Sequence, residues 1–505
     1  MKGLFNMRQC IYSVLLAVCV FHLEPLKAEE TLDTLIVSNL FQIDDSLLRF
    51  QYPKASVKIQ KPVQHKAANF SHTLELQYTP ISQATPYYLI IVPRPLYVSL
   101  SSEIKRYAED VHAIYGYGIY LETTQEASPE QIKYIIQSHG SNLCGCIFIG
   151  DLGEALYEVQ NDYNEYGYRV WPCDLFFMDL DGIWIDSDGN GVYDSHSGNV
   201  EPEIFFGRLS AKGMSVLGSE EELIRKQLKK SHDFWWKNSF HSADSVLNYI
   251  DHDWCSFFPS FQLNQIFANG VVEDVRYCNG GIFSPTNYIS RLTNNGVGFI
   301  HLASHSSPSL HAMTNGYVYL SNILQNSSAS YAFNLFCCSA CNWLASSSQG
   351  YLGGAYLFNN GNTISVIGST KTGSTRDPAT LFYSLASMST GKALLNWWKL
   401  YNGNSHDATE VYWSYGMTLL GDPTLFLKHR VSQYCVSNLT LTSFPSSNES
   451  NLVLYRAENS ITITENFVIP IGVHVIFDAP NVVFSPGFSC PVGATFETRS
   501  EGCEL

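Results

Sequence analysis

Short apolar runs that end in small polar residues recur through the middle of the chain. They occupy residues 88–93, 118–122, 144–149, 245–250, 296–303 and 331–336. Runs of this length between turn residues are typical of buried parallel strands. Helical spacing separates several of them, at residues 100–115, from Ser128 onwards and at residues 218–236. Strands that alternate with helices in this way predict an α/β fold with a parallel sheet.

The two ends of the chain have a different texture. Residues 29–86 are polar and mixed, with short alternating strands, and they suit either a β lead-in or a short pro-segment. From about residue 432 onwards the pattern is again short alternating strands, with turns and no helical spacing. We therefore expect a small all-β C-terminal module at 431–505, after an α/β region at 87–430.

The first 28 residues have the pattern of a cleaved signal peptide. Lys2 and Arg8 supply positive charge, residues 11–23 are apolar, and Ala28 is a small residue suited to cleavage. The apolar part is shorter than the stretch of about 20 residues that a membrane-spanning helix needs. No later stretch has membrane-spanning character, so we expect a protein that is secreted or held at the cell surface.

Composition narrows the classes of function. The 505 residues are 45% hydrophobic, which is enough for a large core, and the formal net charge of −16 argues against nucleic-acid binding. Of the 13 cysteines, Cys10 and Cys19 lie in the signal segment, so an odd number remains and at least one thiol stays unpaired. We expect a Cys490–Cys503 disulfide, with Cys144 and Cys146 in the core.

The strongest chemical signal lies where two of the apolar runs end. His305 follows the run at 296–303, and Cys337 and Cys338 follow the run at 331–336. Reactive groups in α/β sheets gather beyond the carboxyl ends of strands, so neighbouring strands would bring an imidazole and a thiol together. The imidazole can accept the thiol proton and return it to a leaving amine. The residues alone leave a second interpretation open, in which these cysteines and Cys341 are buried core thiols.

A carboxylate to orient that imidazole is available at a third strand end. The run at 245–250 continues into Asp251, His252 and Asp253. Carboxylates in this position are candidates to hold a histidine ring in place. The alternative is a solvated pair of acids that closes the strand.

An acidic loop between residues 179 and 194 predicts a calcium site. Oxygen ligands at alternate positions with a glycine at the sharp turn are how a loop wraps this cation. Ser197 stands where an EF-hand has its bidentate Glu, and Glu201 or Glu203 could supply that group. The alternative is an Asp/Gly-rich hairpin that binds nothing. The expected ligands of this structural ion are Asp186, Asp188, Asn190, Val192 and Asp194.

The stretch from residue 296 to residue 343 resembles the catalytic region of the gingipain-type cysteine peptidases, a caspase-like clan. In that family a strand ends in His, and a second strand delivers Ala-Cys-x-Asn-Gly-x-aromatic. Trp343 stands five places after Cys338, which favours Cys338 as the nucleophile, and His305 precedes Cys338 by 33 residues, similar to the family spacing. The order Cys337-Cys338-Ser339-Ala340 also resembles the Cys-x-Ser-Gly of related peptidases, which would select Cys337.

Other motifs follow in the order that the resemblance implies. Residues 149–151, 202–209 and 415–425 resemble family segments, and Asp253 matches an acid that contacts the catalytic His, commonly Glu in the family, with Asp251 as the alternative. Ser306 departs from the family, which commonly has Gly there. The resemblance implies a caspase-like catalytic domain in two subdomains and a secreted cysteine endopeptidase that acts on proteins or peptides without a catalytic cofactor. The loop at 369–373 is expected to form part of the substrate cleft wall.

A function of another class stays open at this stage. The Ser306 departure and the crowded cysteines are compatible with a non-catalytic adhesin or binding protein on a peptidase-like scaffold. The C-terminal strands resemble stacked-strand modules appended to exported proteins of Bacteroidetes, so we expect them to anchor the protein to a surface or a partner.

Overall fold

The computed structural model describes residues 70–237, 244–255, 263–267, 271–376, 378–402, 408–428 and 435–503. The predicted signal peptide and most of the predicted lead-in, residues 29–86, lie outside these residues. Within the described part of the chain, no helix has the length and apolar character needed to cross a membrane.

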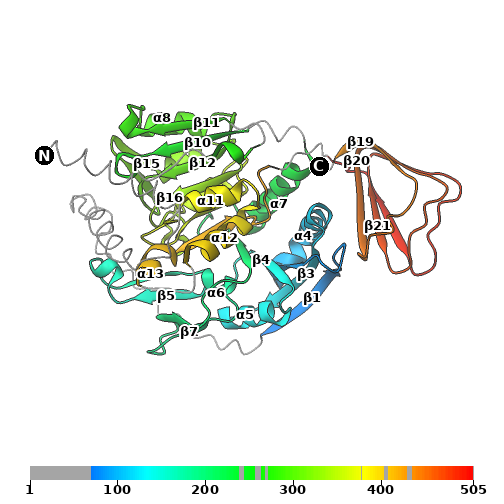
Figure 1. Ribbon diagram of the computed structural model, residues 1–505, viewed down its shortest axis with the longest axis horizontal. Coiled ribbons are helices and arrows are strands. Elements are labelled where there is room, and N and C mark those ends of the chain that lie inside the picture. Colours follow the sequence, from blue (N-terminus) through cyan, green and yellow to red (C-terminus); the bar gives the residue numbers. More distant parts are fainter. Residues whose placement is uncertain are drawn as a thin grey trace, which may run out of the picture. The chain divides into compact units, whose positions relative to one another are not determined.

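An eleven-stranded sheet forms the centre of the structure (Figure 1). Neighbouring strands are parallel except for β1–β3 and β17–β18, so the prediction of a mixed α/β fold with a mostly parallel sheet is confirmed. In spatial order the strands are β1 (Ser71–Tyr78), β3 (Gly118–Gln125), β2 (Tyr87–Pro93), β4 (Leu143–Ile149), β9 (Phe205–Leu209), β18 (Met417–Gly421), β17 (Ser365–Ser369), β16 (Ala332–Phe336), β12 (Val297–Ala303), β10 (Ser245–Ile250) and β11 (Val272–Arg276). The first five lie before residue 210, and the other six lie after residue 244.

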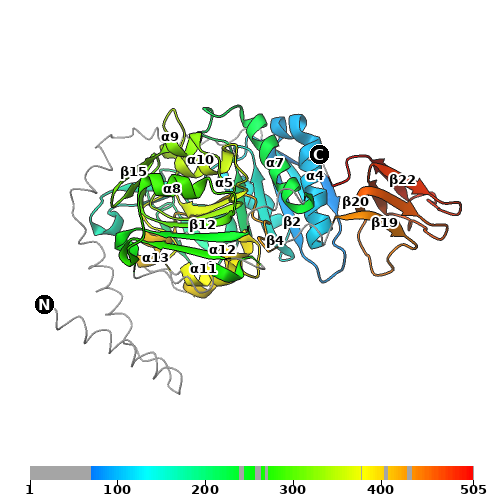
Figure 2. The ribbon, with the colours of Figure 1, turned by 90° about the horizontal axis from the view of Figure 1, so that it is seen from above.

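Helices cover both faces of the sheet (Figure 2), which explains the continuous apolar runs of its central strands. Side chains throughout β12 and β16 are buried. The helices are α4 (Arg94–Tyr115), α5 (Pro129–Ser138), α6 (Leu175–Met178), α7 (Glu220–Trp236), α8 (Pro285–Leu292), α9 (Leu320–Gln325), α10 (Leu352–Phe358), α11 (Pro378–Leu385), α12 (Thr390–Asn402) and α13 (Ala408–Ser414). Ser128 caps α5 and Ser219 caps α7, each in a reciprocal bond with the third residue of its helix.

The residues after 435 form stacked parallel strands. The bounds are β19 (Val436–Leu441), β20 (Leu452–Ile463), β21 (His474–Asp478), β22 (Asn481–Phe484) and β23 (Thr495–Arg499). All pairings among these strands are parallel and join one coil to the next, as Leu452 pairs with His474 and His474 with Thr495. A separate apolar core that includes Ile461, Phe467 and Phe477 fills the coils. The expectation of strand rungs without helices in this stretch is therefore confirmed.

The predicted Cys490–Cys503 disulfide is wrong. Cys503 is bonded to Cys435 instead, and Cys490 is a free thiol. The reason lies in the parallel coils: Gly502 packs against the backbone of Ala457, and Ala457 pairs with Val436, the neighbour of Cys435. A second disulfide joins Cys255 to Cys278. Cys144 and Cys146 are free and pack in the main core, as the sequence predicted.

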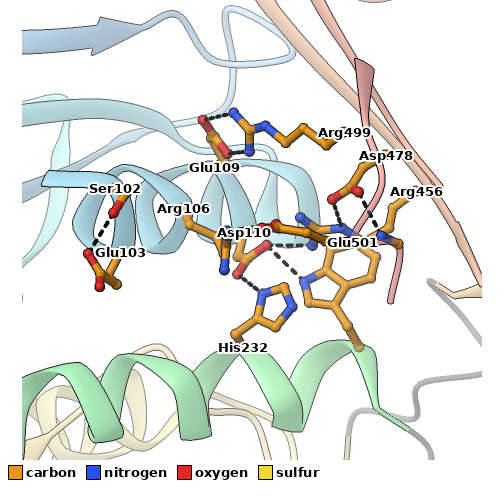
Figure 3. Close-up of polar contacts among 12 residues, drawn as sticks. Ser102, Glu103, Arg106, Glu109, Asp110, His232, Arg456, Asp478, Arg499 and Glu501 are labelled. Carbon is orange, nitrogen blue, oxygen red and sulfur yellow. Dashed lines mark hydrogen bonds and ion pairs between the residues drawn. The ribbon is translucent and has the colours of Figure 1, made fainter. Parts of the chain in front are cut away.

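Buried ion pairs join the C-terminal strands to helix α4, and helix α4 to helix α7 (Figure 3). Arg456 of β20 donates to Asp110 of α4 at 2.8 Å and to Asp478 of β21 at 3.0 Å. His232 of α7 bonds the other oxygen of Asp110 at 2.7 Å. Burial raises the pKa of Asp110, but the charges and hydrogen bonds of His232 and Arg456 outweigh it, and that pKa falls from 3.8 to about 2.

A second pair lies at the edge of this network. Arg499 of β23 holds Glu109 with two hydrogen bonds of 2.5 and 3.0 Å. The side chains of Arg456, Asp110 and Asp478 are almost completely excluded from solvent. A charge buried in such a network has no water to replace a lost partner, so the removal of one partner leaves the others uncompensated.

We predict that Arg456→Met lowers the free energy of unfolding by about 3–5 kcal/mol, because it leaves the Asp110 and Asp478 carboxylates buried without their cation. The matched control is Arg94→Met, since Arg94 makes a 2.9 Å ion pair with Glu75 but its side chain is 50% exposed. That control is expected to cost less than about 1 kcal/mol. Urea unfolding measures both variants, and equal losses would contradict this account of the network.

Candidate active site

The parallel register of β12 and β16 brings His305 and Cys338 to the same edge of the sheet. Ala303 pairs with Phe336, and the Ser304 amide donates to the Phe336 carbonyl at 3.3 Å. His305 and Cys338 each follow this last pair by two residues. Since adjacent strands lie about 4.8 Å apart, both residues follow the ends of neighbouring strands. Figure 1 shows β10, β12 and β16 in consecutive positions.

Asp253 is the carboxylate that lies against His305. It belongs to a short 3₁₀ turn, η3 (His252–Trp254), which follows β10, the neighbour of β12. Its Oδ2 lies 3.2 Å from His305 Nε2. The hydrogen bond from His305 lowers the pKa of Asp253, and it outweighs the opposing effect of partial burial. With Nε2 on the carboxylate, the Nδ1 atom of His305 is left for a reaction partner.

Asp251, the alternative acid, is used in a different way. Its side chain accepts hydrogen bonds from the His252 amide at 2.8 Å and from the Thr314 amide and hydroxyl. The Asp251 side chain is buried. It caps the η3 turn and ties that turn to Thr314, which directly follows strand β14 (Leu310–Met313). The structure therefore brings Asp253 together with His305, and places Asp251 in the support beneath it.

The adjacent cysteines lie in different environments, because Cys337 directly follows β16 and Cys338 begins a turn. The thiol of Cys337 is buried, with its Sγ 3.7 Å from both the Ser304 hydroxyl and the Leu302 carbonyl. Burial raises the pKa of the Cys337 thiol to about 12. Cys338 is partly exposed. Burial of its sulfur raises the pKa of Cys338 too, but a backbone contact with Gly373 and the charge of Lys371 oppose that rise.

The turn that carries Cys338 is clamped to the loop after β17. The Ser339 amide donates to the Lys371 carbonyl at 2.7 Å, and the Cys341 amide donates to the Ser369 carbonyl at 2.9 Å. Ser339 has a φ of 55°, in the left-handed region that residues other than glycine rarely adopt. Strained backbone of this kind is characteristic of functional sites, where surrounding contacts hold it.

The expected cleft-wall loop contributes a buried cation beside that turn. Lys371 Nζ lies 3.0 Å from Asp162 Oδ1, under the rings of Tyr163 and Trp171. Burial lowers the pKa of Lys371 and raises that of Asp162, while the pair's own charges oppose both shifts. The sequence did not single out Asp162, since it lies in an unrelated hairpin far earlier in the chain.

Ser306, the departure from the family pattern, faces inward. It lies in the strand β13 (His305–Ser307) and its side chain is buried. Its hydroxyl is 3.1 Å from His311 Nδ1, and the other nitrogen of His311 is 3.0 Å from the Tyr356 hydroxyl. The Ser306 hydroxyl is thus accommodated by hydrogen-bonded side chains, His311 and Tyr356, inside the protein.

The acidic loop forms two groups of carboxylates that could hold a metal ion. One consists of Glu158, Asp188 and Asp194, and the other of Asp179, Asp181 and Glu203, with ligand atoms within 4.8 Å of one another in each group. Asp188 and Asp194 were predicted ligands. Glu158, on β5 (Leu156–Val159), was missed because it is remote in sequence.

The other predicted ligands shape the loop itself. Asp186 accepts hydrogen bonds from the amides of Gly189, Asn190 and Gly191. Asn190 donates to Glu158 and Asp188, and its oxygen accepts from the Val192 amide at 2.8 Å. In the second group, burial raises the pKa of Asp179, but its 2.7 Å bond with His196 and the charge of Lys133 leave it lowered overall.

Several solved structures are similar to this chain at low sequence identity. The crystal structure of the Arg-specific cysteine proteinase gingipain R (RgpB) covers 72% of this chain and 84% of its own, at 13% identity and a TM-score of 0.47. The complex of Porphyromonas gingivalis RgpB pro- and mature domains covers 70% of this chain and 84% of its own, at 13% identity and a TM-score of 0.48. A structure described as a protease covers 69% of this chain and 79% of its own, at 14% identity and a TM-score of 0.45. A comparison with curated proteins found no match.

Sequence family models give a more direct result than these distant structural likenesses. Residues 81–428 match the model of peptidase family C25, and this span is well over half of the chain. It contains the strand ends that carry Asp253, His305 and Cys338, and membership implies substrates with peptide bonds. The chain therefore belongs to peptidase family C25, the gingipain family.

Proposed function

We propose that the protein is an exported cysteine endopeptidase in which Cys338 is the nucleophile, His305 the acid and base, and Asp253 the group that orients the imidazole. The observation that carries the proposal is the placement of His305 and Cys338 after paired strands at equal register, with Asp253 at 3.2 Å from the imidazole. Cys337 is set aside because its thiol is buried beneath the strand end.

In this mechanism the imidazole is needed as a base. Burial keeps the pKa of Cys338 above its ordinary value, so the free enzyme holds a thiol. His305 accepts the thiol proton as sulfur attacks the scissile carbonyl, and Asp253 stabilises the imidazolium that forms. The imidazolium then gives its proton to the leaving amine. Water, deprotonated by His305, hydrolyses the resulting thioester and restores the thiol.

Developing charge on the substrate oxygen needs donors from the backbone. We assign this role to the amide of Cys338 and to an amide of the loop after His305. The left-handed conformation at Ser339 supports the first assignment, because it turns the chain sharply just after the nucleophile. No metal or organic cofactor takes part in these steps. We assign catalysis to 87–430, and a surface- or partner-binding role to 431–505.

Peptide cleavage tests the proposal. We expect Cys338→Ala to lower kcat/KM on a fluorogenic peptide library at least about a thousandfold, because it removes the nucleophile. Cys337→Ala is the matched control, and it should retain activity. His305→Ala should resemble Cys338→Ala.

Alkylation by iodoacetamide gives an independent readout of the same site. Mass spectrometry should show labelling of Cys338 that slows in His305→Ala, while buried Cys337 and Cys341 stay unlabelled. Cys490, a partly exposed free thiol in the C-terminal strands, is the internal control whose rate should ignore His305. Labelling of Cys338 at the same rate in both proteins, with no cleavage, would favour a binding protein on a peptidase scaffold.

We propose further that the group of Glu158, Asp188 and Asp194 binds a structural calcium ion. Three carboxylates with converging oxygens suit a hard cation, and Asp186 keeps the loop wrapped through its amide bonds.

Calcium should therefore raise the thermal midpoint of unfolding, and a chelator should lower it. At a hundredfold excess over Kd the gain is about 2.7 kcal/mol. Glu158→Gln should weaken the effect, whereas Asp181→Asn, in the second group, should leave it. The reverse pattern would assign the ion to the second group. A thermal midpoint that does not change with calcium would refute the calcium site.

Export is the remaining part of the proposal, and it rests on the sequence pattern of residues 1–28. Expression of the full chain in a bacterial host with a general secretion system should yield a mature protein that begins at Glu29. Intact mass of the exported product measures this. A product that retains Met1 would refute cleavage.

A further inference from the structure

Trp254, the residue after Asp253, packs directly against the imidazole of His305. The centroids of the two rings are 5.4 Å apart with an interplanar angle of 51°. On another side the indole meets Phe336 edge-on at 5.0 Å, the last paired residue of the strand that leads to Cys338. Trp254 is buried. The indole therefore fills the space between the imidazole and the strand end, and restricts how far the imidazole can rotate.

The next residue, Cys255, fastens this turn to a different strand. Its disulfide partner Cys278 lies in η5 (Tyr277–Asn279), which directly follows β11 at the edge of the sheet. Arg276 donates to the Cys255 carbonyl at 3.0 Å. The rings of His252 and Tyr277 are 5.2 Å apart, so both ends of η3 contact the same segment.

The position of Asp253 depends on these attachments. A 3₁₀ turn of three residues has few hydrogen bonds of its own and is weak in isolation. Asp251 holds the beginning of the turn through Thr314. The Cys255–Cys278 disulfide and the hydrogen bond from Arg276 hold its end. The carboxylate that meets His305 lies between these two anchors, on a side chain that is itself partly exposed. The loss of the second anchor would free the turn at the end that carries Trp254.

We propose that Trp254 and the Cys255–Cys278 disulfide are positioning elements of the candidate site, which hold Asp253 and His305 in the geometry that serves Cys338. This inference rests on the proposed function. It implies that the candidate site needs the Cys255–Cys278 pair oxidised while the Cys338 thiol stays reduced. Cys278 is exposed, so a dithiol can reach the bond. The dithiol forms its own disulfide and transfers two electrons and two protons, which leaves Cys255 and Cys278 as thiols.

The double variant Cys255→Ser/Cys278→Ser tests the proposal without a reductant. We expect kcat to fall at least about tenfold with little change in KM, because misplacement of catalytic groups by a fraction of an ångström affects the transition state most. The matched control is Cys435→Ser/Cys503→Ser, which removes the other disulfide, in the C-terminal strands, and should leave kcat unchanged. Equal kcat values in both double variants and the wild type would overturn the proposal.

Substitution of the indole provides a second test that leaves the disulfide intact. Trp254→Phe keeps an aromatic ring beside His305 and should retain most of kcat, whereas Trp254→Ala should lose it as the double variant does. A purely structural role would reduce the amount of folded protein but not kcat per folded molecule. Equal kcat values for Trp254→Ala and Trp254→Phe would refute the role of Trp254.

The labelling rate of Cys338 separates this inference from the proposed function. A wild-type protein that cleaves no peptide, yet labels Cys338 in a His305-dependent manner that is lost in Cys255→Ser/Cys278→Ser, would refute peptidase activity and support the positioning role. Labelling that is unchanged in this variant would refute the positioning role whether or not the wild type cleaves peptides.

Discussion

The register between β12 and β16 is the constraint on which the candidate site depends. Because side chains alternate along a strand, a slip of one residue would exchange the buried Cys337 with the partly exposed Cys338. A polar pair in the middle of the two strands opposes such a slip. Asn334 donates to His301 at 3.0 Å, the two are register partners, and both are fully buried. Burial lowers the pKa of His301 to about 3, so its imidazole is neutral and can accept that bond.

Much of the sheet followed from the sequence because buried parallel strands need continuous apolar runs, and helices must separate them. The same rule placed His305 and Cys338 at one edge, since the carboxyl ends of parallel strands meet there. What escaped prediction depends on contacts between distant segments. Glu158 joins the acidic loop from a hairpin, Trp254 after β10 contacts His305 after the neighbouring β12, and Cys435 meets Cys503 only because the C-terminal coils stack. None of these contacts has a local signature.

The candidate site and the C-terminal strands are held by different kinds of interaction. Backbone pairing and a disulfide fix Asp253, His305 and Cys338. Buried charge fixes the C-terminal strands, through the ion pair of Arg456 with Asp110 of α4. Replacement of such a buried network by apolar residues can preserve stability, so its value lies at least as much in the single orientation it allows. The network therefore sets which face of the coils packs against α4.

The stacked coils place oppositely charged residues in one column. Arg456 pairs with Asp478, and Asp478 pairs with Arg499, so the charge alternates from one coil to the next. The alignment of this column therefore requires a fixed number of residues between the charged position and the rest of its strand. A residue gained within a strand would put an uncharged residue opposite a charged one, because the neighbours of Arg456, Asp478 and Arg499 are all uncharged. Extra residues in a turn can bulge outward and leave the column intact. Related chains should therefore vary in length at the turns of these coils, or by whole coils, and keep the distance between successive charges of the column constant.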